Sequence, residues 1–420
     1  MKIAVWHNLP SGGGKRLLYD HVAGLLARGH TLEAWRPPTA SSDYLPLDGL
    51  IPEHVVELRQ TAPRRTDTLG LTLAAARAIE AMDAHCRACA EEINRGGFDI
   101  LLSNSCYFFA TSAIGRFVNI PSVIYLGEPY RRHYEPMPRN PWMAMAGPYA
   151  PPILAPLTSR EGFRDFKRVS NQRLQVREEI KNAAGFSRIL VNSYFSRESV
   201  LRAYGLDSDV CYPGINGELF VDKRLNRGYS LVGLGSMTAE KNARLCIEAI
   251  AKLPAPRPPL IWIANVAEPH HYADMKALAS SRDVTFDVRI RVSDAELVDT
   301  LNTAMALLYA PRLEPFGLAP IEANACGLPV IAVAEGGVRE TVIDEVNGLL
   351  VDNDPLAMAK AIERLASDPS LARKLGSNGR AMASEKWSSS AAIDRLETRL
   401  GHYAGLARPR NVSSFAGRAT

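Results

Sequence analysis

The sequence predicts an α/β protein with two doubly wound parallel sheets, and three observations support this fold class. First, short apolar runs such as KIAVW (2–6) and SVIYL (122–126) alternate with segments that carry apolar residues at helical spacing, which is typical of parallel sheets covered by helices. Second, the alternation starts again after a stretch rich in Pro, Gly, Asn and charge at 213–227. Third, 420 residues exceed what one hydrophobic core usually supports. We therefore expect two Rossmann-like domains.

The first half begins with the strand at 2–6. A helix follows because Leu18, Val22 and Leu25 share one helical face, and Gly29 ends it. The remaining elements predicted for this half are strands at 31–35 and 54–58, an Ala-rich helix at 71–95, and strands at 99–103 and 122–126.

The second half repeats the same order of strands and helices. Its predicted strands are 230–235, 260–264, 305–310, 329–333 and 348–351. Its predicted helices are 241–253, 270–281, 294–303, 317–326, 355–367, 370–386 and 388–401.

The composition is that of an ordinary globular protein, with 46% hydrophobic and 22% charged residues. A formal net charge of +4 without a long basic run argues against nucleic-acid binding. Six cysteines spread over the chain do not form a disulfide framework. The N-terminus predicts a strand rather than a secretory signal, so we expect a cytoplasmic protein.

The longest uncharged run, 140–159, contains five prolines and does not predict a membrane-spanning helix. Two interpretations stay open: an extended surface loop, or a segment at 142–154 that docks peripherally on the inner face of a membrane or on an apolar acceptor. Basic residues near an anionic bilayer add about 1 kcal/mol each. Those close in sequence are Arg131, Arg132, Arg139, Arg160, Arg164, Lys167 and Arg168.

The most informative stretch is RLEPFGLAPIEANACGLPVIAVAEGGVRETV (312–342). Glu314 and Glu322 stand eight residues apart, and Gly317 marks the start of a helix that ends before Gly327. A glycine-opened helix start presents unpaired N–H groups and a positive dipole end, which together form a phosphate site. A carboxylate further along that helix suits sugar or ribose hydroxyls, so this turn fits a nucleotide-sugar.

These residues resemble the E-x7-E motif of retaining GT-B glycosyltransferases of family four, the glycosyl transferases group 1. Further segments resemble that family in the same order over most of residues 1–400: HNLPSGGGKRLLYDHVAGLLARGHTLEAW, FDILLSNS, NIPSVIYLGEPYRR, ILVNSYFSRESVLRAYG, YPGINGELF, LVGLGSMTAEKNARLCIEAIAKL and NGLLVDNDPLAMAKAIERLASDP. The resemblance implies two Rossmann-like domains that face a cleft, with a C-terminal helix crossing back to the first domain. We accordingly predict an acceptor-side domain at 1–213, a nucleotide-sugar domain at 214–386, a crossover helix at 387–405 and a flexible tail at 406–420.

The resemblance implies roles for residues of the second domain. Lys241 contacts the diphosphate, Glu314 contacts the transferred sugar, and Glu322 binds the ribose hydroxyls. Such charge-assisted hydrogen bonds are worth roughly 1.5–3 kcal/mol each. Backbone N–H groups that bind sugar or phosphate are expected at Phe316, Gly317 and Leu318.

The sequence departs from the family pattern at Ser236 and Gly127. Ser236 stands where an arginine often grips the diphosphate, so this position offers a hydroxyl instead of a charge; Arg244, Arg289 and Arg291 are the candidates to compensate. Gly127 stands where many relatives carry a histidine at the reacting centre. We rank Glu128 first among the residues that can take that place, ahead of Arg131 and His133.

Gly13 and Gly14 lie in the loop SGGGK (11–15), which the resemblance places beside the donor phosphates and the acceptor. The three glycines permit positive φ and close backbone approach. The loop is not a Walker loop, because it lacks a Lys-Ser/Thr pair at the required spacing. The alternative to a phosphate-binding loop is a plain flexible turn.

Two further patterns predict no chemistry. The Asp-x-Asp strings at 207–209 and 352–354 lie in polar turns, so we predict no catalytic metal. Cys86 and Cys89 form a lone CxxC inside the Ala-rich helix without a second ligand pair at zinc spacing, which favours a structural role over a redox pair.

The sequence therefore predicts a retaining, metal-independent glycosyltransferase without a cofactor. Its donor is a UDP- or GDP-linked sugar, and its sugar or lipid-linked hydroxyl acceptor belongs to polysaccharide, lipopolysaccharide or glycolipid assembly. The alternative is a catalytically weak or inactive sugar-nucleotide-binding subunit, which Gly127 and Ser236 favour. A sugar-nucleotide epimerase on the same fold would need acid/base side chains that the sequence does not place.

Overall fold

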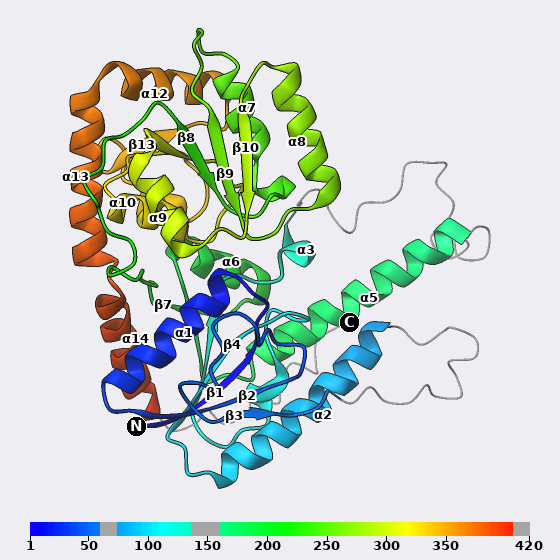
Figure 1. Cartoon of the computed structure of the whole chain (residues 1–420). Coiled ribbons are helices and arrows are strands. Elements are labelled where there is room, and N and C mark those ends of the chain that lie inside the picture. Colours follow the sequence, from blue (N-terminus) through cyan, green and yellow to red (C-terminus); the bar gives the residue numbers. More distant parts are fainter. Residues whose placement is uncertain (59–73, 136–159, 406–420) are drawn as a thin grey trace. The chain divides into compact units, whose positions relative to one another are not determined.

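The computed structural model describes residues 1–58, 74–135 and 160–405. Contacts divide the chain into two compact units. Unit 1 holds Met1–Val191, Arg197–Val210 and the residues from Leu396 onward, and unit 2 holds Asn192–Ser196 and Cys211–Arg395. Each unit contains one parallel sheet with helices packed on it (Figure 1).

The sheet of unit 1 has the strand order β3-β2-β1-β4-β5-β6-β7, and every neighbouring pair is parallel. From β1 the chain continues to β2 and β3 on one side of the sheet and then returns to β4 on the other side of β1. The loops after β1 and β4 therefore lie side by side at the carboxyl edge of the sheet. The strands are β1 (Lys2–Asn8), β2 (Thr31–Arg36), β3 (Glu53–Val55), β4 (Ile100–Cys106), β5 (Ser122–Leu126), β6 (Arg188–Val191) and β7 (Asp209–Val210). The helices are α1 (Gly13–Ala27), α2 (Ala74–Arg95), η2 (Ala113–Arg116), α3 (Arg131–Tyr134), α5 (Arg160–Ala183) and α6 (Tyr194–Tyr204), whose first turn belongs to unit 2.

The sheet of unit 2 has the order β10-β9-β8-β11-β12-β13, again parallel throughout. Its strands are β8 (Leu231–Leu234), β9 (Leu260–Ala264), β10 (Phe286–Ile290), β11 (Ala306–Tyr309), β12 (Val330–Val333) and β13 (Gly348–Val351). Its helices are η3 (Ala239–Lys241), α7 (Ala243–Ile250), α8 (Pro269–Ser281), α9 (Asp294–Thr303), α10 (Leu318–Ala325), α11 (Val338–Thr341), α12 (Pro355–Ser367), α13 (Pro369–Lys386) and the first part of α14 (Ser389–Ala404).

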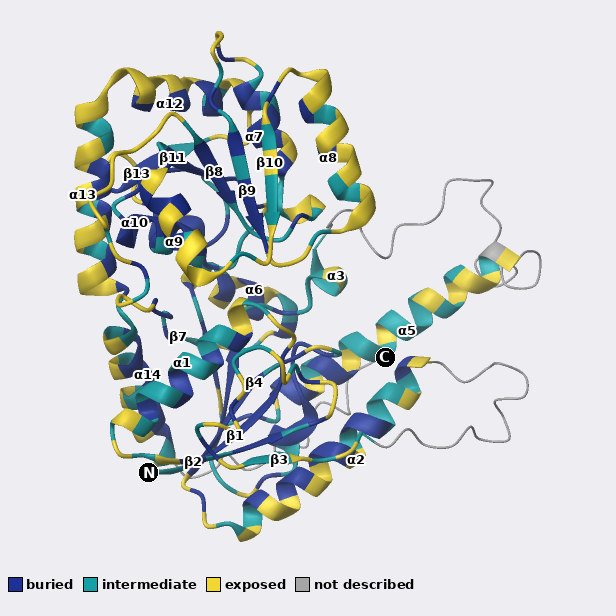
Figure 2. Ribbon diagram, in the orientation of Figure 1, coloured by how far each residue is buried: buried dark blue, intermediate teal, exposed yellow. Residues whose placement is uncertain are grey.

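The central strands of both sheets are buried on their two faces, which explains why they are apolar without alternation, whereas edge strands such as β3 and β10 are only partly buried (Figure 2). In unit 2 the packing is tight at Gly233, where a Cβ atom would lie 2.2 Å from the Trp262 ring. The Trp262 indole donates a 2.8 Å hydrogen bond to the carbonyl of Gly235. This bond fixes the loop that leaves β8 and leads to the candidate site.

The structure confirms the predicted fold class and adds elements that the sequence reading missed. Among these are β6, β7, β10 and the helices α5, α6 and α11. Helix α5 is rich in charged residues and only its C-terminal end is buried, so it lacks a continuous apolar stripe. The predicted helix at 241–253 is divided into η3 and α7, because Asn242 takes a left-handed conformation with φ of 54°. The predicted strand at 54–58 is shorter and lies at Glu53–Val55.

The contacts change unit between Val210 and Cys211, close to the predicted boundary at 213. Within α14, the residues through Arg395 group with unit 2 and those from Leu396 with unit 1, where Glu397 accepts a 2.7 Å hydrogen bond from Arg28. The predicted limits of the domains and of the crossover helix stay predictions. The predicted tail at 406–420 and the segment at 142–154 lie outside the described residues.

Candidate functional site

The candidate site begins at the turn that joins β11 to α10. Gly317 is the N-cap of α10 and has φ of 93°, a conformation that residues with a side chain rarely adopt. A Cβ atom at this position would also lie 3.4 Å from the Thr341 hydroxyl oxygen and from Val338. The glycine therefore allows the chain to enter α10 abruptly, and the first N–H groups of the helix are left without partners inside the helix.

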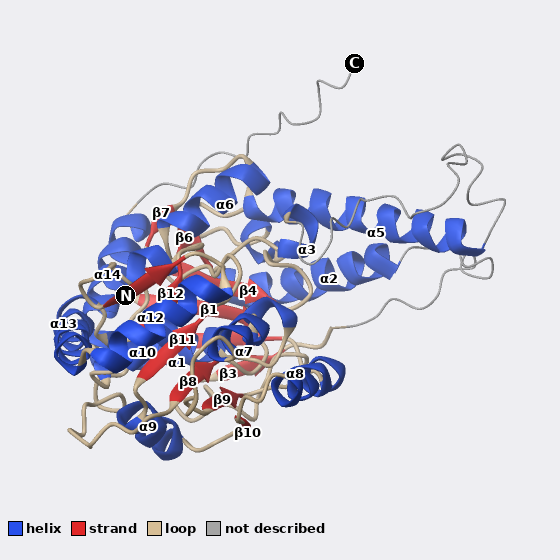
Figure 3. Ribbon diagram, turned by 90° about the horizontal axis from the view of Figure 1, so that it is seen from above, coloured by secondary structure: helices blue, strands red, loops and turns tan. Residues whose placement is uncertain are grey.

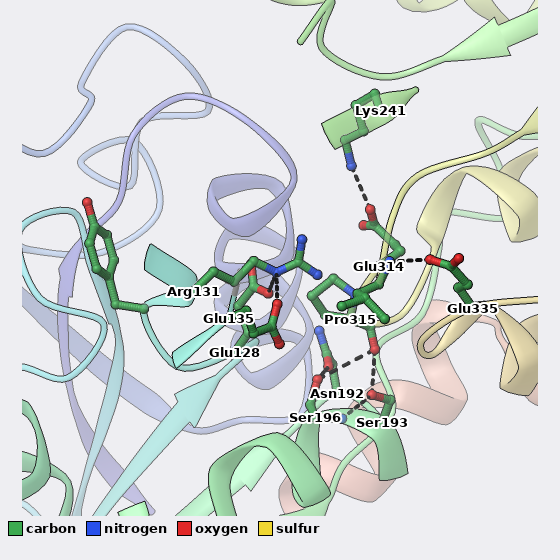
Figure 4. A network of polar contacts seen from close by, with 12 residues as sticks. Glu128, Arg131, Glu135, Asn192, Ser193, Ser196, Lys241, Glu314, Pro315 and Glu335 are labelled. Carbon is green, nitrogen blue, oxygen red and sulfur yellow. Dashed lines mark hydrogen bonds and ion pairs between the residues drawn. The ribbon is translucent and has the colours of Figure 1, made fainter. Parts of the chain in front are cut away.

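Glu314 and Lys241 form an ion pair in unit 2. Nζ of Lys241 lies 2.7 Å from Oε2 of Glu314, and the two side chains are 26% and 19% exposed (Figure 4). Lys241 ends η3 after β8, whereas Glu314 follows β11. Because β8 and β11 are parallel neighbours, their carboxyl ends meet at one edge of the sheet. The topology thus brings together two residues that the sequence keeps 73 positions apart.

The backbone that carries Glu314 is held by a pair of glycines that the sequence reading did not single out. Gly337 donates a 2.7 Å hydrogen bond from its N–H to the Glu314 carbonyl. A Cβ atom would lie 2.1 Å from the Pro315 carbonyl oxygen at Gly337, and 2.4 Å from the Glu314 carbonyl oxygen at Gly336. The GG pair shortly after the strand predicted at 329–333 was the available signal for this close approach.

Glu335, which follows β12, also stabilises the turn that carries Glu314. Its carboxylate accepts hydrogen bonds from Nε of Arg312 at 2.8 Å and from the Leu313 N–H at 3.3 Å. The Pro315 carbonyl of this turn also accepts hydrogen bonds from the hydroxyls of Ser193 and Ser196 (Figure 4). Rigid backbone around Glu314 favours a fixed orientation of its carboxylate.

The first turn of α6 is capped by a carboxylate from α11. Glu340 accepts 3.0 Å hydrogen bonds from the N–H groups of Tyr194 and Phe195, and a 2.8 Å bond from the Tyr212 hydroxyl. An acidic side chain is favourable at this end of a helix dipole. Glu340 follows the same GG pair and was also missed in the sequence, because its partners lie about 140 residues away in the chain.

Tyr309, at the end of β11, is buried and interacts with both glutamates of the motif. Burial raises the pKa of Tyr309 well above its usual value, and the Glu314 and Glu322 carboxylates add to the rise. The two carboxylates, on the turn and on the second turn of α10, therefore act on one buried phenol. Glu322 itself is half-buried, and the motif residues Phe316, Gly317 and Leu318 lie between them.

Ser236 lies in the loop after β8, next to Gly235, and is half-buried. A Cβ atom at Gly235 would lie 3.3 Å from the Lys241 side chain, so the loop packs along the lysine stem. Ser236 and Lys241 are thus parts of one short connection. Arg289, one candidate to replace the missing positive charge, pairs instead with Asp287 at 2.8 Å.

The predicted residues of the first domain lie in unit 1. Gly13 and Gly14 are the exposed first residues of α1, after β1. Glu128 follows β5 and pairs with Nε of Arg131, whose other carboxylate partner is Glu135 at 3.5 Å (Figure 4). Both segments follow the carboxyl ends of parallel strands.

The remaining predicted patterns take part in structural contacts. Asp209 accepts a 2.5 Å hydrogen bond from the Tyr403 hydroxyl, and Asp354 caps α12 through the Ala357 N–H at 2.8 Å. Cys86 and Cys89 are buried in α2, and burial raises the pKa of both thiols, that of Cys89 to about 12. Across the described ranges no group of three or more His, Cys, Asp or Glu side chains is arranged to hold a metal ion.

Comparison with known proteins places this site in context. Residues 222–382 match the family Glycosyl transferases group 1. Alpha-1,3/1,6-mannosyltransferase ALG2 of Homo sapiens is 30% identical over 238 residues, which are 50% of this chain and 56% of that protein. D-inositol 3-phosphate glycosyltransferase of Streptomyces bingchenggensis is 32% identical over 242 residues, which are 51% of this chain and 52% of that protein. The chain thus spans about half the length of the curated relatives it matches.

Solved structures resemble the chain over nearly its whole length. A glycosyltransferase from Rickettsia africae has a TM-score of 0.67 at 17% identity and covers 96% of this chain and 99% of its own. HepE from Anabaena, in complex with UDP-glucose, has a TM-score of 0.65 at 18% identity and covers 96% and 100%. At these identities the likeness concerns the fold, which is that of the GT-B proteins.

Proposed function

We propose that this chain transfers a sugar from a nucleotide-diphospho-sugar to a hydroxyl acceptor, because residues 222–382 match the family Glycosyl transferases group 1, in agreement with the sequence resemblance. The observation that carries the proposal is the Lys241–Glu314 pair beside the glycine-opened start of α10. The Lys241 cation, the N–H groups at the start of α10 and the carboxylates of Glu314 and Glu322 match the charge pattern of a diphosphate joined to a sugar and a ribose.

The roles follow from the chemistry of the departing group. As the sugar leaves, negative charge grows on the diphosphate, and Lys241 together with the N–H groups at 316–318 stabilises it. We assign Glu314 to the transferred sugar. We assign Glu322, on the second turn of α10, to the ribose hydroxyls, from which its carboxylate would accept hydrogen bonds. Ser236 adds a hydroxyl donor on the diphosphate side.

We propose retention of the anomeric configuration without a metal ion, in keeping with the family resemblance. In such a reaction the bond from the anomeric carbon to the diphosphate oxygen breaks, and a bond to the acceptor oxygen forms on the same face. The acceptor proton passes to the leaving phosphate. Gly13, Gly14 and Glu128 of unit 1 are assigned to the acceptor side, with Glu128 held by Arg131 rather than free to act as a strong base.

The relatives suggest the setting. HepE is named in complex with UDP-glucose, ALG2 is a mannosyltransferase, and another structural neighbour, WaaG, is named as a glycosyltransferase involved in lipopolysaccharide biosynthesis. We propose a UDP- or GDP-linked donor, a sugar or lipid-linked acceptor in surface polysaccharide, lipopolysaccharide or glycolipid assembly, and a cytoplasmic location that includes the inner face of the membrane.

The test is release of nucleoside diphosphate from UDP- and GDP-sugars in the absence of acceptor. Slow release from one donor class that disappears in Glu314→Ala supports an enzyme. Nucleotide binding without any release, in the presence or absence of simple glycoside acceptors, would favour the second candidate, a binding subunit. The observations behind that candidate are Gly127 and Ser236, which replace residues that relatives use at the reacting centre.

A further inference from the structure

Strand β10 forms one edge of the sheet of unit 2, and its outer side has no partner among the residues that the structure describes. Figures 1 and 3 show it at the end of that sheet, next to β9. The Thr285 carbonyl and the Arg291 N–H bond to β9. Because backbone groups point to alternate sides along a strand, the N–H and C=O groups of Phe286, Val288 and Ile290 point outward. These unpaired groups are a template for another strand.

The opposite edge of the same sheet is covered by its own chain. At β13 the N–H of Leu350 donates a 2.9 Å hydrogen bond to the Asp344 carboxylate, and the Gly348 carbonyl accepts a 2.9 Å bond from the Glu345 N–H. The loop before β13 thus occupies backbone groups of that strand. The described residues give β10 no such cover, so the two edges of this sheet differ.

The usual devices that keep a second strand away from an edge are missing from β10. Such devices are a proline, a bulge or an unpaired charge. The sequence of β10, FDVRI, contains no proline, and its register with β9 runs without a break from Phe286 to Ile290. Its two charges, on Asp287 and Arg289, lie 2.8 Å apart, and Arg289 also lies 3.5 Å from Glu296 of α9. The strand itself therefore carries no net charge that would repel a copy of itself.

The side chains of β10 divide into an apolar face and a charged face. Phe286 and Val288 pack partly buried against the core of unit 2, and Ile290 on the same face is 46% exposed. Asp287 and Arg289 lie on the other face. A partner that suits this edge has to offer apolar side chains on one face and both signs of charge on the other, and β10 has this pattern itself.

We propose that β10 pairs with β10 of a second copy of this chain, as an antiparallel pair centred on Val288. A two-fold axis at Val288 joins the two sheets into one continuous sheet. Val288 exchanges both of its backbone hydrogen bonds with the partner's Val288, and Phe286 does the same with the partner's Ile290. All the outward groups of the strand are then paired, and the exposed Ile290 side chain is covered.

Charge selects this register. With the axis at Val288, Asp287 stands opposite the partner's Arg289, in the closely spaced kind of antiparallel pair whose Cα atoms lie about 4.5 Å apart. An axis at Asp287 or at Arg289 would place like charges opposite each other. Stable interfaces usually involve about 20–30 residues a side, so a contact built on this strand of 5 residues is expected to be weak and to depend on protein concentration.

This inference goes beyond the proposed function, because self-association is measured without donor or acceptor. A chain that stays monomeric would leave the proposed donor site untouched, and a failed nucleotide experiment would leave this edge untouched.

The first experiment is analytical ultracentrifugation of the full chain from about 1 to about 200 µM. We expect the mass to rise with concentration from that of one chain towards that of two. Asp287→Arg alone and Arg289→Asp alone give each strand two charges of one sign, so each variant should self-associate about tenfold more weakly. A 1:1 mixture of the two variants places opposite charges across the axis again, and this mixture should associate as the unchanged chain does.

Matched controls come from α12. Glu363→Arg and Lys360→Glu change the net charge of the chain by the same amounts at exposed positions. Both controls should associate like the unchanged chain. A monomer at every concentration, an equal loss of association in the controls, or a mixture that remains as weakly associated as each variant alone would overturn the proposal.

A second measurement tests the register. The six native cysteines are all buried, so Val288→Cys adds a thiol at the proposed axis. The Cα atoms of a hydrogen-bonded antiparallel pair lie about 5.5 Å apart, within the range that a disulfide spans. Mild oxidation should therefore convert this variant to a covalent dimer. Ile343→Cys, at a 41% exposed position after α11, is the control and should remain a single chain. Association without this disulfide, or equal cross-linking of the control, would refute the pairing at Val288.

Discussion

Nζ of Lys241 lies 2.7 Å from Oε2 of Glu314 at the carboxyl ends of two neighbouring strands. In this arrangement each charge compensates the other while both remain partly exposed. A diphosphate that reaches Lys241 therefore competes with an existing carboxylate partner, and a sugar hydroxyl that reaches Glu314 meets an oriented acceptor. The predictions below start from this pair and from the glycines and helices that hold it.

Lys241→Met should abolish most turnover while leaving the fold intact. In the proposed reaction this change removes the charge that stabilises the departing diphosphate, and removal of a single such group typically costs about 10²–10³ in rate. Release of nucleoside diphosphate from the active donor measures the effect. Lys252→Met, an exposed lysine of the same unit, is the control. A rate for Lys241→Met close to that of the control would remove Lys241 from the site.

Glu322→Ala should remove the thermal stabilisation that a nucleoside diphosphate gives. A ligand at about 100 times its Kd adds roughly 2.7 kcal/mol, and each kcal/mol moves the Tm of a domain of this size by about 2–4 °C. We expect one of UDP and GDP to raise the Tm of the unchanged chain and of Glu363→Ala, a control on α12. If Glu322→Ala keeps the full shift, the ribose does not bind at this carboxylate.

Gly337→Ala should disturb Glu314 through backbone packing alone. Its new Cβ atom would lie 2.1 Å from the Pro315 carbonyl oxygen, and overpacking of this kind costs about 1–3 kcal/mol. Chemical denaturation gives the loss in unfolding free energy, and nucleotide titration gives the loss in affinity. Gly217→Ala is the matched control, because nothing lies within 4 Å of its Cβ position. Equal behaviour of the two variants would show that the turn tolerates displacement.

Glu179 should make unfolding depend on pH in a defined window. Burial raises the pKa of this α5 carboxyl from 4.5 to about 7, although Tyr204 and the Tyr130 N–H donate to it. Between these two values the folded chain holds a proton that the unfolded chain releases, so stability falls as pH rises from about 4.5 through about 7. The unfolding free energy of the unchanged chain should therefore decrease relative to that of Glu179→Gln over this range.

The comparison with Glu179→Gln isolates this group. Burial lowers the pKa of His7 and of His21 to about 4, and their opposite contribution is present in both proteins and cancels. Parallel curves for the two proteins would contradict the assignment. Any change would report on the segment after β5, because the Glu179 carboxylate accepts a 3.0 Å bond from the Tyr130 N–H, two residues after Glu128.

The sequence by itself determined the fold class and the central motif. Short continuous apolar runs indicate strands such as 305–310 and 329–333, because fully buried parallel strands are apolar on both faces. Gly317 was predictable because a helix that starts abruptly needs a residue that tolerates positive φ. Glu314 and Glu322 followed from their spacing within one continuous segment.

Only the tertiary structure decided which distant residues support that segment. Gly337, Ser193 and Glu340 hold the Glu314 turn and the first turn of α6 through backbone atoms. In each contact at least one partner is a backbone group, which leaves no signature in the sequence, and the partners are brought together only by the fold. Helix α5 escaped prediction for a related reason: an amphipathic pattern reveals a helix most clearly where one side of it is fully buried, and the described residues of α5 before Glu178 are only partly buried or exposed.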